Sequence, residues 1–127
     1  MNTAESYNTL TSEIIASAIE VHRRLGPGLL ESAYEACLVY ELRKRGLKAF
    51  SQVGLPVIYD EVHLDVGYRI DVLVEDAVII ELKAVEKVIP LHEAQLISYL
   101  KLSGKKVGLL LNFNVTRLKD GIKRLAN

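Results

Sequence analysis

Two carboxylates and a lysine, Asp71, Glu81 and Lys83, occur in a segment with the residue pattern of a β-hairpin. Two runs rich in Val, Ile and Leu flank a polar turn at residues 75–77, which is typical of paired strands. With these residues as the loop, Asp71 lies opposite Glu81, and Lys83 lies on the same face. Facing residues in paired strands have Cβ atoms about 4.5–5.5 Å apart, so the two carboxylates repel each other. The arrangement therefore needs a compensating group.

Three kinds of group could compensate this repulsion: the Lys83 ammonium, a proton shared by the acids, or a hard divalent cation with oxygen ligands. Mg²⁺ suits the pair best, because proteins usually hold it with one or two carboxylates, waters and substrate phosphate. The alternative is a surface hairpin whose outer face carries ordinary solvated charges, as half-exposed strands often do.

The register of this hairpin follows from its apolar pattern. A two-residue loop would place Asp71 opposite Ile80, and a slip of one residue moves every side chain to the other face. A loop at residues 75–77 instead pairs apolar residues with each other. We therefore predict one buried apolar face, made of Ile70, Val72, Val74, Val78, Ile80 and Leu82.

Length and composition predict a single globular domain over residues 1–127, with half of the residues apolar and a quarter charged. No apolar run approaches the roughly 18–20 residues of a membrane span. The polar start of the chain, from Met1 to Glu5, lacks the basic and apolar regions of a signal peptide. We therefore expect a cytoplasmic protein that does not contact membranes.

The charges balance, with 16 basic and 16 acidic side chains. This balance argues against affinity for nucleic acid that depends on bulk charge, although it leaves room for a local basic stripe. The basic residues do form clusters, each of which is more typical of a solvated surface than of a binding site. They are Arg23-Arg24, Arg43-Lys44-Arg45 with Lys48, Lys101 with Lys105-Lys106, and Arg117-Lys119 with Lys123-Arg124.

Three amphipathic segments and several short strands must position these residues. Apolar residues recur at helical spacing, and the helices are expected at residues 11–25, 30–45 and 92–102. Strands are expected at residues 47–53, 55–59, 62–64 and 106–112, besides the hairpin, while residues 116–127 remain ambiguous. This order predicts an α/β sandwich in which a mixed sheet carries helices on its faces.

Four motifs in this order carry a family resemblance. They are residues 28–34 (GLLESAY), residues 67–71 (GYRID), residues 81–83 (ELK) and residues 95–99 (QLISY). The first resembles the signature of the GxxExxY protein family, and the others are similar to motifs of RecB-like nucleases in the PD-(D/E)XK nuclease superfamily. No proline precedes Asp71, which departs from the superfamily pattern at a lax position. The resemblance implies a restriction-endonuclease-like core with a mixed sheet flanked by helices.

The resemblance also implies roles for the hairpin residues. Asp71 and Glu81 would hold the metal, with the backbone carbonyl of Leu82 as a third ligand, since hard cations take oxygen donors. The metal would polarise the scissile phosphate and lower the pKa of a water molecule. Lys83 would orient that water or stabilise the developing charge, or in a protein without catalysis it would neutralise the acids.

Four further residues are implied by the resemblance, on three helices. Glu31 would contact the metal through water, although the helix dipole alone also explains an acid there. Gln95 and Tyr99 are four residues apart on one helix face and would donate hydrogen bonds to phosphate or water. Without the resemblance, Gln95 would be interpreted as a surface residue and Tyr99 as a core residue. His22 is a further candidate ligand, or a hydrogen-bonded histidine between packed elements.

Together these residues predict a nuclease that uses Mg²⁺ or Mn²⁺ to hydrolyse phosphodiester bonds of nucleic acid, with DNA as the expected substrate. One alternative is a non-catalytic nuclease-like module that binds nucleic acid or a protein. Another is a phosphodiesterase for small molecules; an enclosed apolar pocket would favour it, and a basic groove would favour the nuclease. A homodimer is expected by analogy only.

Overall fold

The computed structural model describes residues 3–65 and 67–127. Met1 and Asn2, which begin the polar segment considered above, lie outside the described residues. The described chain contains α1 (Ala4–Leu25), α2 (Glu31–Lys44), α3 (Pro90–Ser103) and a 3-10 helix, η1 (Leu118–Gly121). None of the described helices is both long enough and apolar enough to cross a membrane.

Five strands form the main sheet in the order β1-β4-β5-β6-β7. They are β1 (Ala49–Gly54), β4 (Arg69–Val74), β5 (Val78–Lys83), β6 (Val107–Asn112) and β7 (Ile122–Ala126). β5 and β6 are parallel and are connected through α3, whereas the other neighbouring strands are antiparallel. The predicted α/β class and mixed sheet are confirmed.

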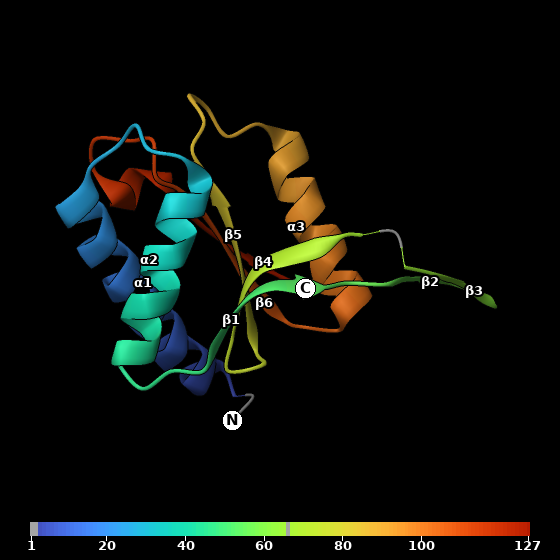
Figure 1. The fold of residues 1–127 in the computed structure, drawn as a ribbon. Helices are drawn as coiled ribbons and strands as arrows, with labels where there is room; N and C mark the ends of the chain where they lie inside the picture. Colours follow the sequence, from blue (N-terminus) through green and yellow to red (C-terminus); the bar gives the residue numbers. More distant parts are fainter. Residues whose placement is uncertain (1–2, 66) are drawn as a thin grey trace.

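The sheet lies between helices, with α1 and α2 on one face and α3 on the other (Figure 1). β6 is buried along its whole length, and only Lys83 of β5 is partly exposed. Strands covered on both faces are expected to be continuously apolar, as these two are except for a few polar residues. Two apolar cores result, one under α1 and α2 and one under α3. A polar residue in the middle of this sheet is therefore exceptional.

The first helix begins earlier than the predicted residue 11. A capping box at its start explains the difference, because the Thr3 hydroxyl accepts the Ser6 N–H at 3.1 Å and the Thr3 N–H donates to the Ser6 hydroxyl at 3.2 Å. The ambiguous tail forms η1 and β7, and β7 pairs with β6 as an edge strand.

The predicted hairpin register is confirmed where strands β4 and β5 pair. Val74 pairs with Val78, and the ladder continues as far as Val72 and Ile80. There it ends, and beyond this point β4 pairs only with β1. The prediction was wrong for Ile70, which packs into the core under α3, because β4 no longer follows β5 beyond the end of the ladder.

A short hairpin projects from the main sheet between β1 and β4 (Figure 1). It consists of β2 (Val57–Tyr59) and β3 (Val62–Leu64), which form a separate two-stranded sheet. The predicted strand at residues 55–59 is shorter than expected, because Leu55 packs into the core under α3 and the strand begins only after Pro56.

Candidate active site

The two predicted acids lie where the β4–β5 ladder ends, and their side chains replace its hydrogen bonds. Glu81 Oε2 accepts the backbone N–H of Asp71 at 2.9 Å, and Asp71 Oδ2 accepts the backbone N–H of Leu82 at 2.9 Å. Each carboxylate therefore satisfies a backbone donor of the opposite strand. One oxygen of each acid remains outside these two bonds, and both acids are held in fixed positions.

Burial makes this pair costly to ionise. Glu81 is 5% exposed, and burial, followed by the nearby charge of Asp71, raises the pKa of Glu81 from 4.5 to about 8. Burial also raises the pKa of Asp71, although the Leu82 N–H and the Lys83 charge oppose this change. The predicted repulsion is therefore present, and a bound proton or cation would relieve it.

The Leu82 carbonyl faces the same gap between the strands. The Leu82 N–H points from β5 towards Asp71 on β4. In an extended strand, the N–H and C=O of one residue point to the same side, so the Leu82 carbonyl also points towards β4. The carbonyl of the next residue, Lys83, points the opposite way and accepts the Phe113 N–H at 2.9 Å. Two carboxylates and a carbonyl therefore line this gap, all with oxygen atoms.

These oxygen ligands match a hard cation and not a closed zinc site. Among the residues that the structure describes, no three His, Cys, Asp or Glu side chains converge as a metal-binding group. Structural zinc sites usually take four protein ligands, whereas Mg²⁺ is held by one or two carboxylates and several waters. The residues present therefore fit Mg²⁺ or Mn²⁺.

Lys83 lies at the end of β5, half-buried beside the acids. Its charge lowers the pKa of both Asp71 and Glu81, but less than burial raises it. In the described parts of the chain, Lys83 forms no direct ion pair with either acid. Its ammonium group therefore remains available to a ligand at this site.

Two residues of the site were missed by the sequence analysis. Gln52 on β1 lies between the residues that pair with Val72 and Ile70 of β4, and its amide donates to Glu35 at 2.9 Å and approaches Asp71 Oδ1 at 3.5 Å. Gln52 has a positive φ of 53°, a conformation that costs energy in a residue other than glycine. The pKa of Glu35 is raised, first by burial and also by the charge of Asp71. Spacing offered a signal for Glu35, which is four residues after Glu31 on the same helix face.

Gln95 and Tyr99 lie together beside the acids. Both line a cavity of about 530 Å³ that also contains Lys83. Tyr99 is buried, and its pKa is raised by that burial and then by the charges of Glu81 and Asp71, which places its hydroxyl in their field. Gln95 is exposed to solvent at the cavity wall. The structure thus brings Lys83, Gln95 and Tyr99 to one cavity.

Glu31 and His22 have different surroundings. Glu31 is exposed at the first residue of α2, and its negative charge contributes to the raised pKa of Glu35. His22 is buried, with Nε2 2.8 Å from the carbonyl oxygen of Val115, as expected for a histidine between packed elements. Tyr34 of the first motif stabilises the α1–α2 loop, because its hydroxyl donates a hydrogen bond to the Gly26 carbonyl at 2.6 Å.

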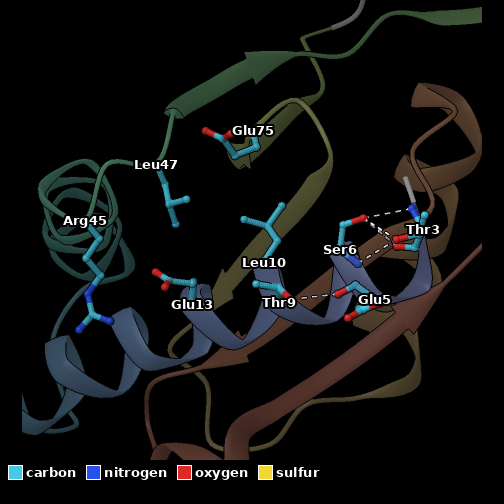
Figure 2. A pocket seen from close by; sticks show the side chains of 9 residues that line it. All are labelled: Thr3, Glu5, Ser6, Thr9, Leu10, Glu13, Arg45, Leu47 and Glu75. Atoms are coloured by element: carbon cyan, nitrogen blue, oxygen red, sulfur yellow. Dashed lines mark hydrogen bonds between the residues drawn. The ribbon is translucent and has the colours of Figure 1, made fainter. Parts of the chain in front are cut away.

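A second hollow, of about 560 Å³, lies between the start of α1, the end of α2 and the β4–β5 turn (Figure 2). Its charged side chains include Glu75 and Arg45, both of which have partners within the protein. Glu75 accepts the Lys48 N–H at 2.6 Å, and Arg45 donates to Glu41 at 3.3 Å. This hollow shares no lining residue with the cavity beside the acids.

The raised pKa of Glu81 predicts an unusual dependence of stability on pH. Because the folded protein holds a proton on Glu81 up to about pH 8 and the unfolded chain releases it near pH 4.5, folding is favoured at low pH. This contribution is fully present below the unfolded pKa and is lost as pH rises through the folded pKa. Without divalent ions, we expect Glu81→Gln to melt several degrees above the wild type at about pH 8.5 and close to it at about pH 5.

Thermal melts at several pH values in EDTA measure this effect. Gln keeps the carbonyl oxygen that accepts the Asp71 N–H, so the variant removes the charge and keeps the hydrogen bond. Glu61→Gln, on an exposed turn of the β2–β3 hairpin, is the matched control and should not change the pH dependence. Equal pH dependence in wild type and Glu81→Gln would contradict a proton held by this pair.

The comparison with known families agrees with this geometry. A family model described as the PD-(D/E)XK nuclease superfamily matches residues 8–125, which includes every residue of the site described above. No curated protein and no solved structure gives a significant match to the chain. The family match covers nearly the whole sequence and agrees with the mixed sheet, its flanking helices and the acidic hairpin. This chain belongs to the PD-(D/E)XK nuclease superfamily.

Proposed function

We propose that this protein is a nuclease that hydrolyses phosphodiester bonds of DNA with the help of Mg²⁺ or Mn²⁺. The observation that carries this proposal is the pair of buried acids, Asp71 and Glu81, at the end of a β-ladder with Lys83 beside them. Burying two acids next to each other costs stability, and such costs are typical of functional sites. Membership of the superfamily supports nuclease activity, and its members generally use divalent metal ions.

Asp71, Glu81 and the Leu82 carbonyl are the residues that would hold the cation. A bound divalent cation supplies Lewis-acid activation of the phosphate and of water. One oxygen of each carboxylate accepts a backbone N–H, which leaves for this purpose the second oxygen of Glu81 and Asp71 Oδ1, 3.5 Å from the Gln52 amide. Gln52 positions Asp71 from the neighbouring strand, and its contact with Glu35 ties α2 to the site.

The cavity residues have roles in holding the phosphate. Lys83 supplies a positive charge that stabilises the negative charge developing on the phosphate oxygens. Gln95, exposed at the wall, donates hydrogen bonds from its amide, and Tyr99 donates from its hydroxyl, whose raised pKa keeps it protonated. These residues bind and orient the substrate, and Lys83 alone among them carries a charge.

A non-catalytic binding module is the second candidate. It is favoured by the pairing of many basic side chains with acidic side chains of the protein itself. Each of the four basic clusters has at least one member that pairs with an acidic side chain of the protein itself. Arg23 and Arg24 both pair with Glu20, at 2.8 and 2.6 Å. Lys105 pairs with Asp76 at 2.9 Å, and Lys123 pairs with Glu93 at 3.0 Å. Such pairing reduces the charge available for phosphates away from the site.

A phosphodiesterase for small molecules fits less well. The cavity beside the acids is bordered by exposed side chains, among them Leu91 at 71% and Tyr68 at 48% exposure. Sites for small substrates usually bury most of the ligand surface, which this open cavity does not favour. An extended polymer can lie across an open cavity, so the structure supports a nucleic acid better.

Incubation of the purified chain with labelled single-stranded, duplex and branched DNA tests the proposal, with matched RNAs in parallel. We expect products from DNA in Mg²⁺ or Mn²⁺ and none in EDTA. Binding without cleavage of any substrate in either ion would contradict the nuclease and support the binding module. Cleavage of RNA but not DNA would contradict DNA as the substrate but would still support metal-dependent hydrolysis of phosphodiester bonds.

A further inference from the structure

We propose that the cavity between α3, Tyr68 and the start of β2 holds an unstacked nucleobase of a single-stranded segment, next to the phosphate at the acids. This inference rests on the proposed function for the position of the phosphate. It adds that the bound strand is single and its base unstacked, and it assigns a binding role to Tyr68.

Two lining residues, Lys83 and Tyr99, place the cavity next to the acidic site. Lys83 follows Glu81 by two residues on β5 and also lines the cavity. Tyr99 lines the same cavity and lies in the electrostatic field of Asp71 and Glu81. A phosphate held by Lys83 therefore places the attached nucleoside at the mouth of the cavity. Its volume of about 530 Å³ is within the range of roughly 300–1,000 Å³ for ligand sites.

The walls of the cavity suit the flat face of a base. Tyr68 is 48% exposed, and the centroid of its ring is 6.3 Å from that of the Tyr99 ring, with the planes tilted by 57°. Val57, Leu91 and Leu102 add apolar surface around the rings. The backbone of Tyr68 is linked to the segment after β1, since its carbonyl accepts the Leu55 N–H at 2.8 Å. An exposed tyrosine ring beside a cavity can serve as a stacking surface, and stacking tolerates any base.

Polar groups along one face of α3 suit the edge of a base. His92, Gln95 and Ser98 line the cavity at intervals of three residues, so they project from the same side of the helix. His92 Nδ1 accepts the Ile89 N–H at 3.2 Å, so in the neutral ring the hydrogen is on Nε2. His92 Nε2–H therefore acts as a donor, while Gln95 and Ser98 both donate and accept. These groups match the mixed donors and acceptors of base edges.

Such a cavity selects a single strand. In a duplex the bases are stacked and paired, so their faces cannot reach Tyr68 without the cost of unstacking. The ion pairs of Arg23, Arg24, Lys105 and Lys123 reduce the charge available for tracking a duplex backbone.

Fluorescence anisotropy with the full chain tests this inference. The probes are a labelled single-stranded DNA, the same sequence as RNA, its DNA duplex, and the single strand with abasic sites, all in Ca²⁺ and checked for integrity on gels. We expect the intact single strands to bind about ten-fold more tightly than the duplex or the abasic strand. Tyr68→Ala should weaken single-strand binding by about five-fold to 100-fold, and Tyr68→Phe should stay within about two-fold of wild type.

Tyr40→Ala is the matched control, because Tyr40 is 67% exposed on α2 and does not line the cavity. Equal binding of duplex and single strand, or unchanged binding by Tyr68→Ala, would overturn the inference even if the protein cleaves duplex DNA. Single-strand binding that depends on Tyr68 would support it even if no substrate is cleaved. The inference and the proposed function can therefore fail separately.

Discussion

Asp71→Asn and Glu81→Ala are each expected to abolish divalent-ion binding and cleavage together. Both variants remove a carboxylate from the gap at the end of the β4–β5 ladder, where two carboxylates and one carbonyl are the oxygen ligands. Loss of Lewis-acid activation removes several kcal/mol of transition-state stabilisation, so we expect cleavage to fall by about 10³-fold or more. Calorimetric titration with Mn²⁺ and single-turnover cleavage assays measure the two effects on the same preparations.

Thermal melts add a check on the acids that does not depend on activity. Divalent ions should raise the melting temperature of the wild type and leave that of Asp71→Asn unchanged. In EDTA, Asp71→Asn should be slightly more stable than wild type, because the amide oxygen can still accept the Leu82 N–H without repelling Glu81. A clearly destabilised Asp71→Asn, with no effect of metal on the wild type, would instead indicate a structural hydrogen bond.

Lys83→Ala should separate binding from catalysis. Lys83 does not supply an oxygen ligand, so its loss should leave Mn²⁺ affinity nearly intact and reduce nucleic-acid affinity by only a few-fold. The cleavage rate should fall by about 10²-fold or more, as the loss of one electrostatic contact with the transition state typically causes. The assay is a single-turnover cleavage rate at saturating protein, compared with binding in Ca²⁺.

Lys119→Ala is the control for this variant, since Lys119 is exposed on η1 and does not line the cavity that contains Lys83. Lys83→Ala with a normal cleavage rate would remove Lys83 from the proposed mechanism. A loss of metal affinity as large as that of Glu81→Ala would mean that Lys83 acts by holding the acids and not by contacting the substrate.

The β4–β5 hairpin shows which strand pairs the local residue pattern can predict and which it cannot. Alternation of apolar and polar residues predicted the loop at residues 75–77 and the pairs from Val74–Val78 to Val72–Ile80, because a one-residue slip would bury charges. The same pattern failed at Ile70. There the carboxylates take over the hydrogen bonds of the ladder, and β4 continues only with β1. Alternation along one strand carries no information on where its neighbour stops pairing.

The helical acid shows a second limit. Glu31 and Glu35 are one turn apart on α2, and helical periodicity places both on the same face. The choice between them depends on how α2 lies against the sheet, which brings Glu35 to Gln52 on β1 and leaves Glu31 exposed. Gln52 had no signal in the sequence, since its role comes from a positive φ and from the contact of its amide with Asp71 on the neighbouring strand.

By itself, the sequence determined the α/β class, the register of the central hairpin and the grouping of Asp71, Glu81 and Lys83 on that hairpin. These features depend on spacing within one or two adjacent elements, and apolar periodicity records such spacing directly. Only the tertiary structure decided the rest of the site: the end of the β4–β5 ladder, the contact of Glu35 with Gln52 and the cavity beneath Tyr68. These features arise where elements distant in the chain pack together, and no local pattern encodes the angle and distance of that packing.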